Sequence, residues 1–86
     1  MSTQAKEDAL VIKLEAIYKT DFELGYVGFS NRTIGLRSKA MRLHAEDLMR
    51  GGTSHKTAWE SAYRCNRLAY LHADSKALMT QMGAAA

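Results

Sequence analysis

The chain has 86 residues, of which 47% are apolar and 24% charged, and it contains no proline. A chain of this size makes one domain with a modest core, and this composition excludes disorder and favours helices. The net charge of +3 is unevenly divided: residues 1–29 carry −2 and residues 30–86 carry +5, which makes nucleic acid or an acidic protein surface a compatible partner.

Two classes of protein are excluded by short segments of the sequence. The longest apolar run, residues 9–12, is too short to cross a bilayer. The N-terminal residues STQAKED are polar and acidic, whereas a secretory signal has basic residues followed by an apolar run. We therefore expect a cytoplasmic protein that does not contact a membrane.

Cys65 is the only cysteine, so an intrachain disulfide is excluded and a buried structural thiol is expected. A shared metal site with His72 is excluded, because seven residues span about 10.5 Å along a helix. No histidine pair has helical ligand spacing, and no glycine loop of the phosphate-binding type precedes a lysine. We expect no metal, no cofactor and no enzymatic activity.

The first predicted helix covers residues 3–20. Leu10, Leu14 and Ile17 recur at i, i+4 and i+7, and Val11 and Tyr18 widen this apolar face. The helix is expected to build the core.

Residues 21–31 form a predicted loop with two glycines, fixed to the core by aromatic side chains at positions 22, 26 and 29. The second predicted helix covers residues 32–50, with Ser30 or Asn31 as its N-cap and Gly51 as its stop. It has apolar residues on two nearly opposite sides, so we expect it to lie between two neighbours. The larger apolar side comprises Ile34, Met41, Ala45, Leu48 and Met49, and the smaller one Leu36, Ala40 and Leu43.

The third predicted helix covers residues 54–82 and begins at a Thr53 or Ser54 cap. One stripe on it has the spacing 4-3-4-3-4, which is typical of a helix packed along a partner helix. We predict that this aromatic stripe faces the core; the alternative is that it stacks nucleic-acid bases. Its members are Trp59, Tyr63, Asn66, Tyr70, Ala73 and Ala77.

An unbroken third helix would be about 45 Å long, whereas a compact chain of this length is only about 30 Å across. Either the helix breaks around residues 73–75, or its end projects and is covered by another chain. Apolar residues opposite the aromatic stripe favour projection, and a partner protein or a homodimer is expected there. The predicted protein-binding residues are Leu71, Leu78, Met79 and Met82.

The basic residues suggest a second hypothesis, in which RGGTS is the turn of a helix-turn-helix motif. Lys56, Glu60, Arg64 and Arg67 would then form the outward stripe of a recognition helix. The third helix continues far beyond the usual length of such a helix, which counts against this motif. An i, i+4 ion pair of Glu60 with Arg64 explains part of the same stripe without any ligand.

The start of the second helix is a predicted anion site, because cations crowd an end where they oppose the helix dipole. A phosphate or carboxylate could bind there through free amides, the hydroxyls of Ser30 and Thr33, and Arg32. The alternative is a solvated ladder of ion pairs along the helix. The residues predicted to bind nucleic acid or another anion are Arg32, Arg37, Lys39, Lys56, Arg64 and Arg67.

Together these patterns predict an all-α, three-helix, non-catalytic regulatory or inhibitor protein. It would bind a larger protein through its long C-terminal helix and its basic helical faces. The alternative is a nucleic-acid-binding regulator of the helix-turn-helix type that uses the arginines of the second and third helices.

Overall fold

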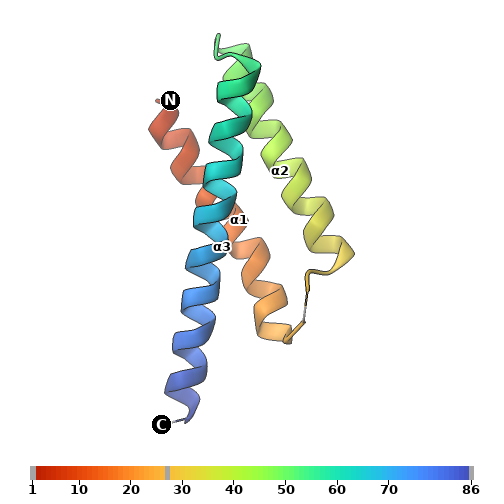
Figure 1. The fold of residues 1–86 in the computed structure, drawn as a ribbon, viewed down its shortest axis with the longest axis vertical. Helices are drawn as coiled ribbons and strands as arrows, with labels where there is room; N and C mark the ends of the chain where they lie inside the picture. Colours follow the sequence, from red (N-terminus) through yellow and green to blue (C-terminus); the bar gives the residue numbers. More distant parts are fainter. Residues whose placement is uncertain (1, 27, 86) are drawn as a thin grey trace.

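The computed structural model describes residues 2–26 and 28–85, which form three α-helices. Helix α1 is Thr3–Leu24, α2 is Asn31–Arg50 and α3 is His55–Ala85. Helices α2 and α3 run in opposite directions as a hairpin, and α1 crosses α3 (Figure 1). The predicted all-α, three-helix class is therefore confirmed.

Helix α3 is continuous over 31 residues and gives the molecule its elongated shape, 50 × 25 × 17 Å. The break considered around residues 73–75 does not occur, and the helix continues through Gly83 rather than ending before it. Its C-terminal end extends past the other two helices (Figure 1). No helix in the described part of the chain combines the length and apolar character needed to cross a membrane.

Serine side chains begin all three helices. The hydroxyls of Ser2, Ser30 and Ser54 accept hydrogen bonds from the backbone amides three residues later, at 3.1, 3.2 and 3.2 Å. Each bond satisfies one of the amides that have no partner inside the helix. Between α2 and α3, Gly52 has a φ of 103°, which a residue with a side chain rarely adopts. The GGTS segment is thus a helix stop followed by a helix start.

Helix α1 ends at Leu24, four residues beyond its predicted end. The stop is Gly25, whose φ of 75° is left-handed and whose amide bonds back to the last turn. The extra turn places Asp21 and Phe22 on the face that already carries Leu14 and Tyr18, so it adds contacts with the core. Of the aromatic residues in the predicted loop, positions 22 and 29 pack on the core and Tyr26 is exposed.

The core of the domain combines large side chains from α1 with small ones from α3. Leu10, Leu14 and Tyr18 are buried on α1, as predicted. On α2 the buried face is rotated from the predicted one: Ile34 is exposed and Ala40 is buried. The reason is that two polar residues, Thr33 and His44, occupy part of the buried face. The buried residues of α2 are Thr33, Ala40, Met41, His44, Ala45 and Leu48.

The fully buried face of α3 lies beside the predicted aromatic stripe, which only partly enters the core. It is a row of small residues, which lets the large side chains of α1 and α2 approach the α3 backbone closely. Tyr63, in the middle of the aromatic stripe, is 59% exposed, and only Ala73 of that stripe is fully buried. The prediction was therefore right only in part: Trp59 packs on the core and Tyr70 contacts the Tyr18 ring, but the fully buried positions of α3 hold small side chains. The small-residue row comprises Ala58, Ser61, Ala62, Cys65, Ala69 and Ala73.

Candidate protein-binding surface

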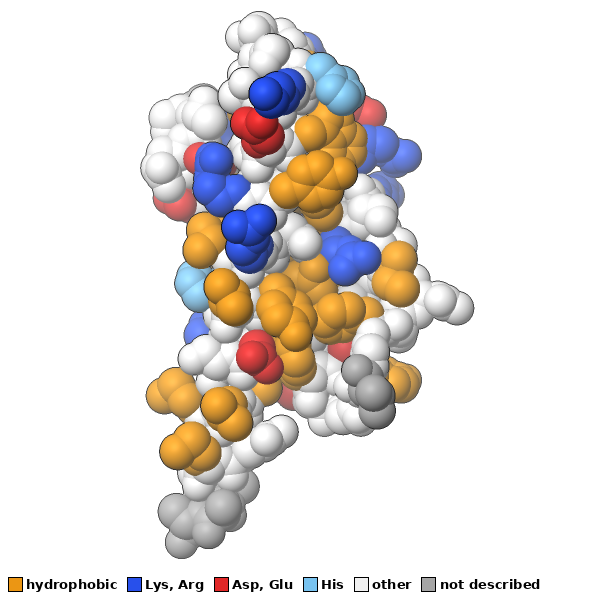
Figure 2. Space-filling view, viewed as in Figure 1, with side chains coloured by type: hydrophobic (Ala, Val, Ile, Leu, Met, Phe, Trp, Pro, Cys, Tyr) orange, Lys and Arg blue, Asp and Glu red, His pale blue; other side chains and the backbone are white. Residues whose placement is uncertain are grey.

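The four residues predicted to bind protein lie on the side of α3 that faces away from the core. Leu71, Leu78, Met79 and Met82 are between 52% and 67% exposed. Ala73 and Ala77, on the other side of the same helix, face α1. Figure 2 shows exposed apolar side chains gathered over the C-terminal part of α3.

A fifth residue, Leu68, extends this surface and was missed by the sequence analysis. It is 43% exposed and lies three residues before Leu71, so Leu68, Leu71, Ser75, Leu78 and Met82 follow one another at intervals of 3, 4, 3 and 4. This spacing keeps the side chains on one line along a helix. We call the C-terminal apolar stripe the set Leu68, Leu71, Leu78, Met79 and Met82.

An ion pair holds the inner side of this part of α3 against α1. Lys76 Nζ lies 2.5 Å from a carboxylate oxygen of Glu15, and His72 lies 3.9 Å from the other oxygen of that carboxylate. The Glu15 side chain is mostly buried. Together with buried Ala69 and Ala73, this contact places α1 on the opposite side of α3 from Leu71, Leu78 and Met82.

The six residues predicted to bind nucleic acid or another anion do not form one surface. Arg64 pairs with Glu7, Lys56 lies 4.0 Å from Glu60, and Arg37 donates a hydrogen bond of 3.4 Å to the hydroxyl of Tyr18. Arg32 and Lys39 line a groove between α1 and α2. Arg67 lies on the exposed side of α3. On the face in view in Figure 2, basic side chains lie at several places, with acidic and apolar side chains between them.

The α2–α3 hairpin also differs from a helix-turn-helix motif. That motif joins two helices at a steep angle, so that the second can enter a groove of DNA. Here the two helices run in nearly opposite directions, close together near the turn that joins them and further apart away from it (Figure 1). Arg64, one of the proposed reading residues, is held by a carboxylate of the same chain.

The predicted anion site at the start of α2 is occupied by a carboxylate of the chain itself, Asp21. One oxygen accepts a hydrogen bond from the backbone amide of Ser30 (2.8 Å) and the other accepts one from the Ser30 hydroxyl (3.1 Å). Burial of Asp21 alone would raise its pKa, but the bonds from Ser30 and Thr33 and the charge of Arg32 bring the pKa below its usual value. Cations at the start of a helix oppose the helix dipole. The negative charge of Asp21, held there by Ser30, offsets this effect at the start of α2.

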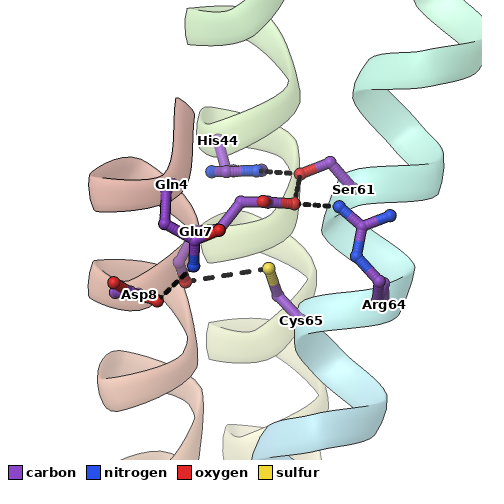
Figure 3. Close-up of polar contacts among 7 residues, drawn as sticks. All are labelled: Gln4, Glu7, Asp8, His44, Ser61, Arg64 and Cys65. Carbon is purple, nitrogen blue, oxygen red and sulfur yellow. Dashed lines mark hydrogen bonds and ion pairs between the residues drawn. The ribbon is translucent and has the colours of Figure 1, made fainter. Parts of the chain in front are cut away.

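A second polar cluster joins all three helices near the opposite end of the domain (Figure 3). The Ser61 hydroxyl donates to Glu7 Oε2 at 2.6 Å, and the same carboxylate pairs with Arg64. Because the Ser61 hydroxyl donates its hydrogen bond to Glu7, the 2.9 Å contact with His44 assigns Nε2 of that histidine as a donor. The Cys65 thiol contacts the backbone oxygen of Glu7 at 3.7 Å.

This cluster lacks the arrangement that activates a nucleophile. The hydroxyl of a catalytic serine donates a hydrogen bond to the histidine that takes its proton, whereas the Ser61 hydroxyl donates a hydrogen bond to Glu7 and accepts one from His44. The bond from Ser61 is the largest cause that lowers the pKa of Glu7, and Arg64 adds to it, so this carboxylate is a weak base. Burial raises the pKa of the Cys65 thiol, which keeps it protonated. The geometry suits a structural connection between the helices.

Acidification should destabilise the fold in two steps. Burial lowers the pKa of His44 from its usual 6.5, so below that pH the unfolded chain takes up a proton that the folded chain resists. The contribution of neutral His44 to the free energy of unfolding is complete above pH 6.5. It is lost as the pH falls towards the pKa that His44 has in the folded chain. The pKa values of Glu7 and Asp21 are lowered from 4.5 and 3.8. These two carboxylates therefore stabilise the fold above those values, and this stabilisation is lost as the pH falls below them.

Denaturant unfolding between about pH 8 and about pH 3 would measure both steps. The variant His44→Gln keeps an amide donor for Ser61 but cannot titrate. It should lose the step just below pH 6.5 and keep the carboxylate step. An unchanged step near pH 6.5 in this variant would contradict the assignment.

Among the described residues, no group of three or more His, Cys, Asp or Glu side chains is arranged to hold a metal ion. Comparison with known proteins gave no matching family model, no matching curated protein and no matching solved structure.

Proposed function

We propose that this chain is a small, non-catalytic regulatory protein that binds a helix of a larger protein along the C-terminal apolar stripe. The observation that carries the proposal is a row of exposed leucine and methionine side chains on the side of α3 opposite the core. Exposed apolar side chains that gather on one side of a helix are typical of an interaction site.

The spacing of the stripe favours a helix as the occupant. Intervals of 3 and 4 residues place the side chains where a partner helix can insert its own between them. From Leu68 to Met82 the stripe is about 21 Å long, which suits three to four turns of a partner helix. Two methionines among five residues make the surface adaptable to the shape of that helix.

The length of the stripe favours a different protein over a second copy of this chain. Two heptads are fewer than the three or four over which a self-paired coiled coil is usually sustained. A larger partner can add contacts outside the stripe and so reach the area of a stable interface. The polar cluster of Glu7, His44 and Ser61 supports a non-catalytic role, because the Ser61 hydroxyl donates its hydrogen bond to Glu7.

The first test uses a synthetic amphipathic helical peptide of three heptads, with leucine at the a and d positions and glutamate and lysine elsewhere. Fluorescence anisotropy should detect its binding to the wild-type protein. The double variant Leu71→Asp, Leu78→Asp should bind at least about 30-fold more weakly, because two exposed apolar contacts are replaced by charges. No binding by the wild type, or equal binding by the variant, would refute the proposal.

A matched control is Ile12→Asp, which replaces a 69% exposed apolar residue on α1 and should leave peptide binding unchanged. Light scattering after size-exclusion chromatography should find a monomer for the wild type. A concentration-dependent dimer that is lost in the double variant would assign the stripe to self-association and overturn the choice of a partner helix. Neither set of substitutions should unfold the chain, since all three positions are exposed.

A further inference from the structure

A groove of about 400 Å³ lies between α1 and α2, and the residues that line it all come from these two helices. It is a different surface from the C-terminal apolar stripe, which lies on α3. On α1 the lining residues are Lys13, Ala16, Ile17 and Thr20, and on α2 they are Arg32, Leu36, Lys39 and Ala40.

The groove has three cationic side chains and no carboxylate among its lining residues. Of the twelve lysines and arginines of the chain, seven have a carboxylate oxygen within 4.0 Å. The other five have no carboxylate oxygen at that distance among the residues that the structure describes. Three of these five are Lys13, Arg32 and Lys39. The charges that the fold leaves unpaired are therefore concentrated at this groove.

The carboxylate of Asp21 lies near this groove, close enough to Arg32 for the charge of Arg32 to lower its pKa. This carboxylate is 3% exposed and both its oxygens already accept hydrogen bonds from Ser30. It is therefore committed to the start of α2, and the outer side of the groove keeps an excess of positive charge.

The groove also has an apolar floor between its cations. On α1, Lys13, Ile17 and Thr20 follow at i, i+4 and i+7, and on α2, Arg32, Leu36 and Lys39 do the same. Each wall thus places an apolar side chain next to a cation, while alanines at positions 16 and 40 leave room between the walls. A ligand that fits this groove has apolar groups along its centre and carboxylates on both sides.

We propose that this groove binds an acidic amphipathic helix from another protein, with its apolar side against Ile17 and Leu36 and its carboxylates near Lys13, Arg32 and Lys39. Laying an amphipathic helix in a groove between two helices is a common mode of peptide recognition. Nucleic acid suits the site less well, because no aromatic side chain lines it to stack a base. The proposal does not depend on the occupant of the C-terminal apolar stripe.

The test uses a fluorescein-labelled helical peptide of four turns, with leucine on one face and glutamate on both flanks. Binding to the wild-type protein should weaken as salt is raised, since exposed charges contribute to it. The double variant Lys13→Glu, Lys39→Glu should bind at least tenfold more weakly, and a peptide with glutamine in place of glutamate should bind the wild type equally weakly. Leu36→Gln should also weaken binding, which a purely electrostatic attraction would not predict.

A matched control variant is Lys56→Glu, Arg67→Glu, which makes the same change in net charge on α3, away from the groove. It should change the affinity less than twofold. Equal loss in both double variants, no binding by the wild type, or tighter binding of a single-stranded RNA oligonucleotide that depends on Lys13 and Lys39 would each overturn the proposal. Circular dichroism checks that each variant is folded, and Lys39→Gln replaces the double variant if the latter is not.

Discussion

Replacing Tyr18 by alanine is expected to lower the free energy of unfolding by about 3–5 kcal/mol, the range for truncating a large buried aromatic side chain. Tyr18 is 1% exposed, and its ring centroid lies 4.9 Å from that of Phe29 and 5.7 Å from that of Tyr70. Its hydroxyl donates to Asn66 and accepts from Arg37. A domain of this size has a total stability of about 4–13 kcal/mol, so the variant should be partly or largely unfolded.

Tyr63→Ala is the matched control, because it makes the same chemical change at a residue that is 59% exposed. Its effect should stay below about 1 kcal/mol. Denaturant unfolding followed by circular dichroism measures both variants. The comparison also distinguishes the two candidate faces of α3, because the aromatic stripe predicted from the sequence would make Tyr63 as sensitive as Tyr18.

Ala62→Leu is expected to be the second most damaging substitution, with a cost of about 1–3 kcal/mol or more from overpacking. Ala62 is 0% exposed and lies in the small-residue row of α3, in the same core cluster as Leu14 and Met41. A leucine there would force the helices apart or drive neighbouring side chains out of their preferred rotamers.

Ala9→Leu is its control, because Ala9 is an exposed alanine in the interior of α1. Leucine is nearly as good a helix former as alanine, so the free energy of unfolding should change by less than about 0.5 kcal/mol. Thermal unfolding of the two variants beside the wild type measures the difference. A stable Ala62→Leu protein would mean that α3 packs on α1 through another face.

The features of the fold that depend on local chemistry could be predicted from the sequence. Ser30 and Ser54 mark helix starts because serine supplies a hydroxyl to a free amide, and the stop after α2 is marked by Gly51 and by Gly52, whose φ of 103° favours glycine. Leu10, Leu14 and Tyr18 form a single face on α1 because their spacing matches the helical period. Such rules act within a few residues, so no knowledge of the other helices was needed.

The features that depend on packing between helices could not be predicted in the same way. Periodicity assigned both Trp59 and Tyr63 to the core, but only Trp59 packs on it, whereas Tyr63 is exposed. The fully buried positions of α3 lie against large residues of α1 and α2 and hold only alanines, a serine and a cysteine. The buried carboxylate of Asp21 was missed because the loop folds back to bring it to Ser30. Contacts of this kind depend on the path of the chain in space.

For the candidate surfaces, the sequence predicted positions better than it predicted roles. The exposure of Leu71, Leu78 and Met82 follows from helical geometry once the opposite side of α3 is known to face α1. That these residues bind a protein stays a prediction. Lys13 was not among the predicted basic residues, because it joins Arg32 and Lys39 only when α1 and α2 pack side by side.

The small-residue row of α3 also determines when the chain can fold during synthesis. Of the main core cluster, Leu10, Leu14 and Tyr18 come from the first quarter of the chain and Met41 from its middle, but the surface they close upon extends to Ala73. Synthesis proceeds from the N-terminus at about 5–20 residues per second, so α1 and α2 leave the ribosome before their largest side chains have a surface to cover them. We therefore expect the domain to complete its folding late, once most of α3 has emerged.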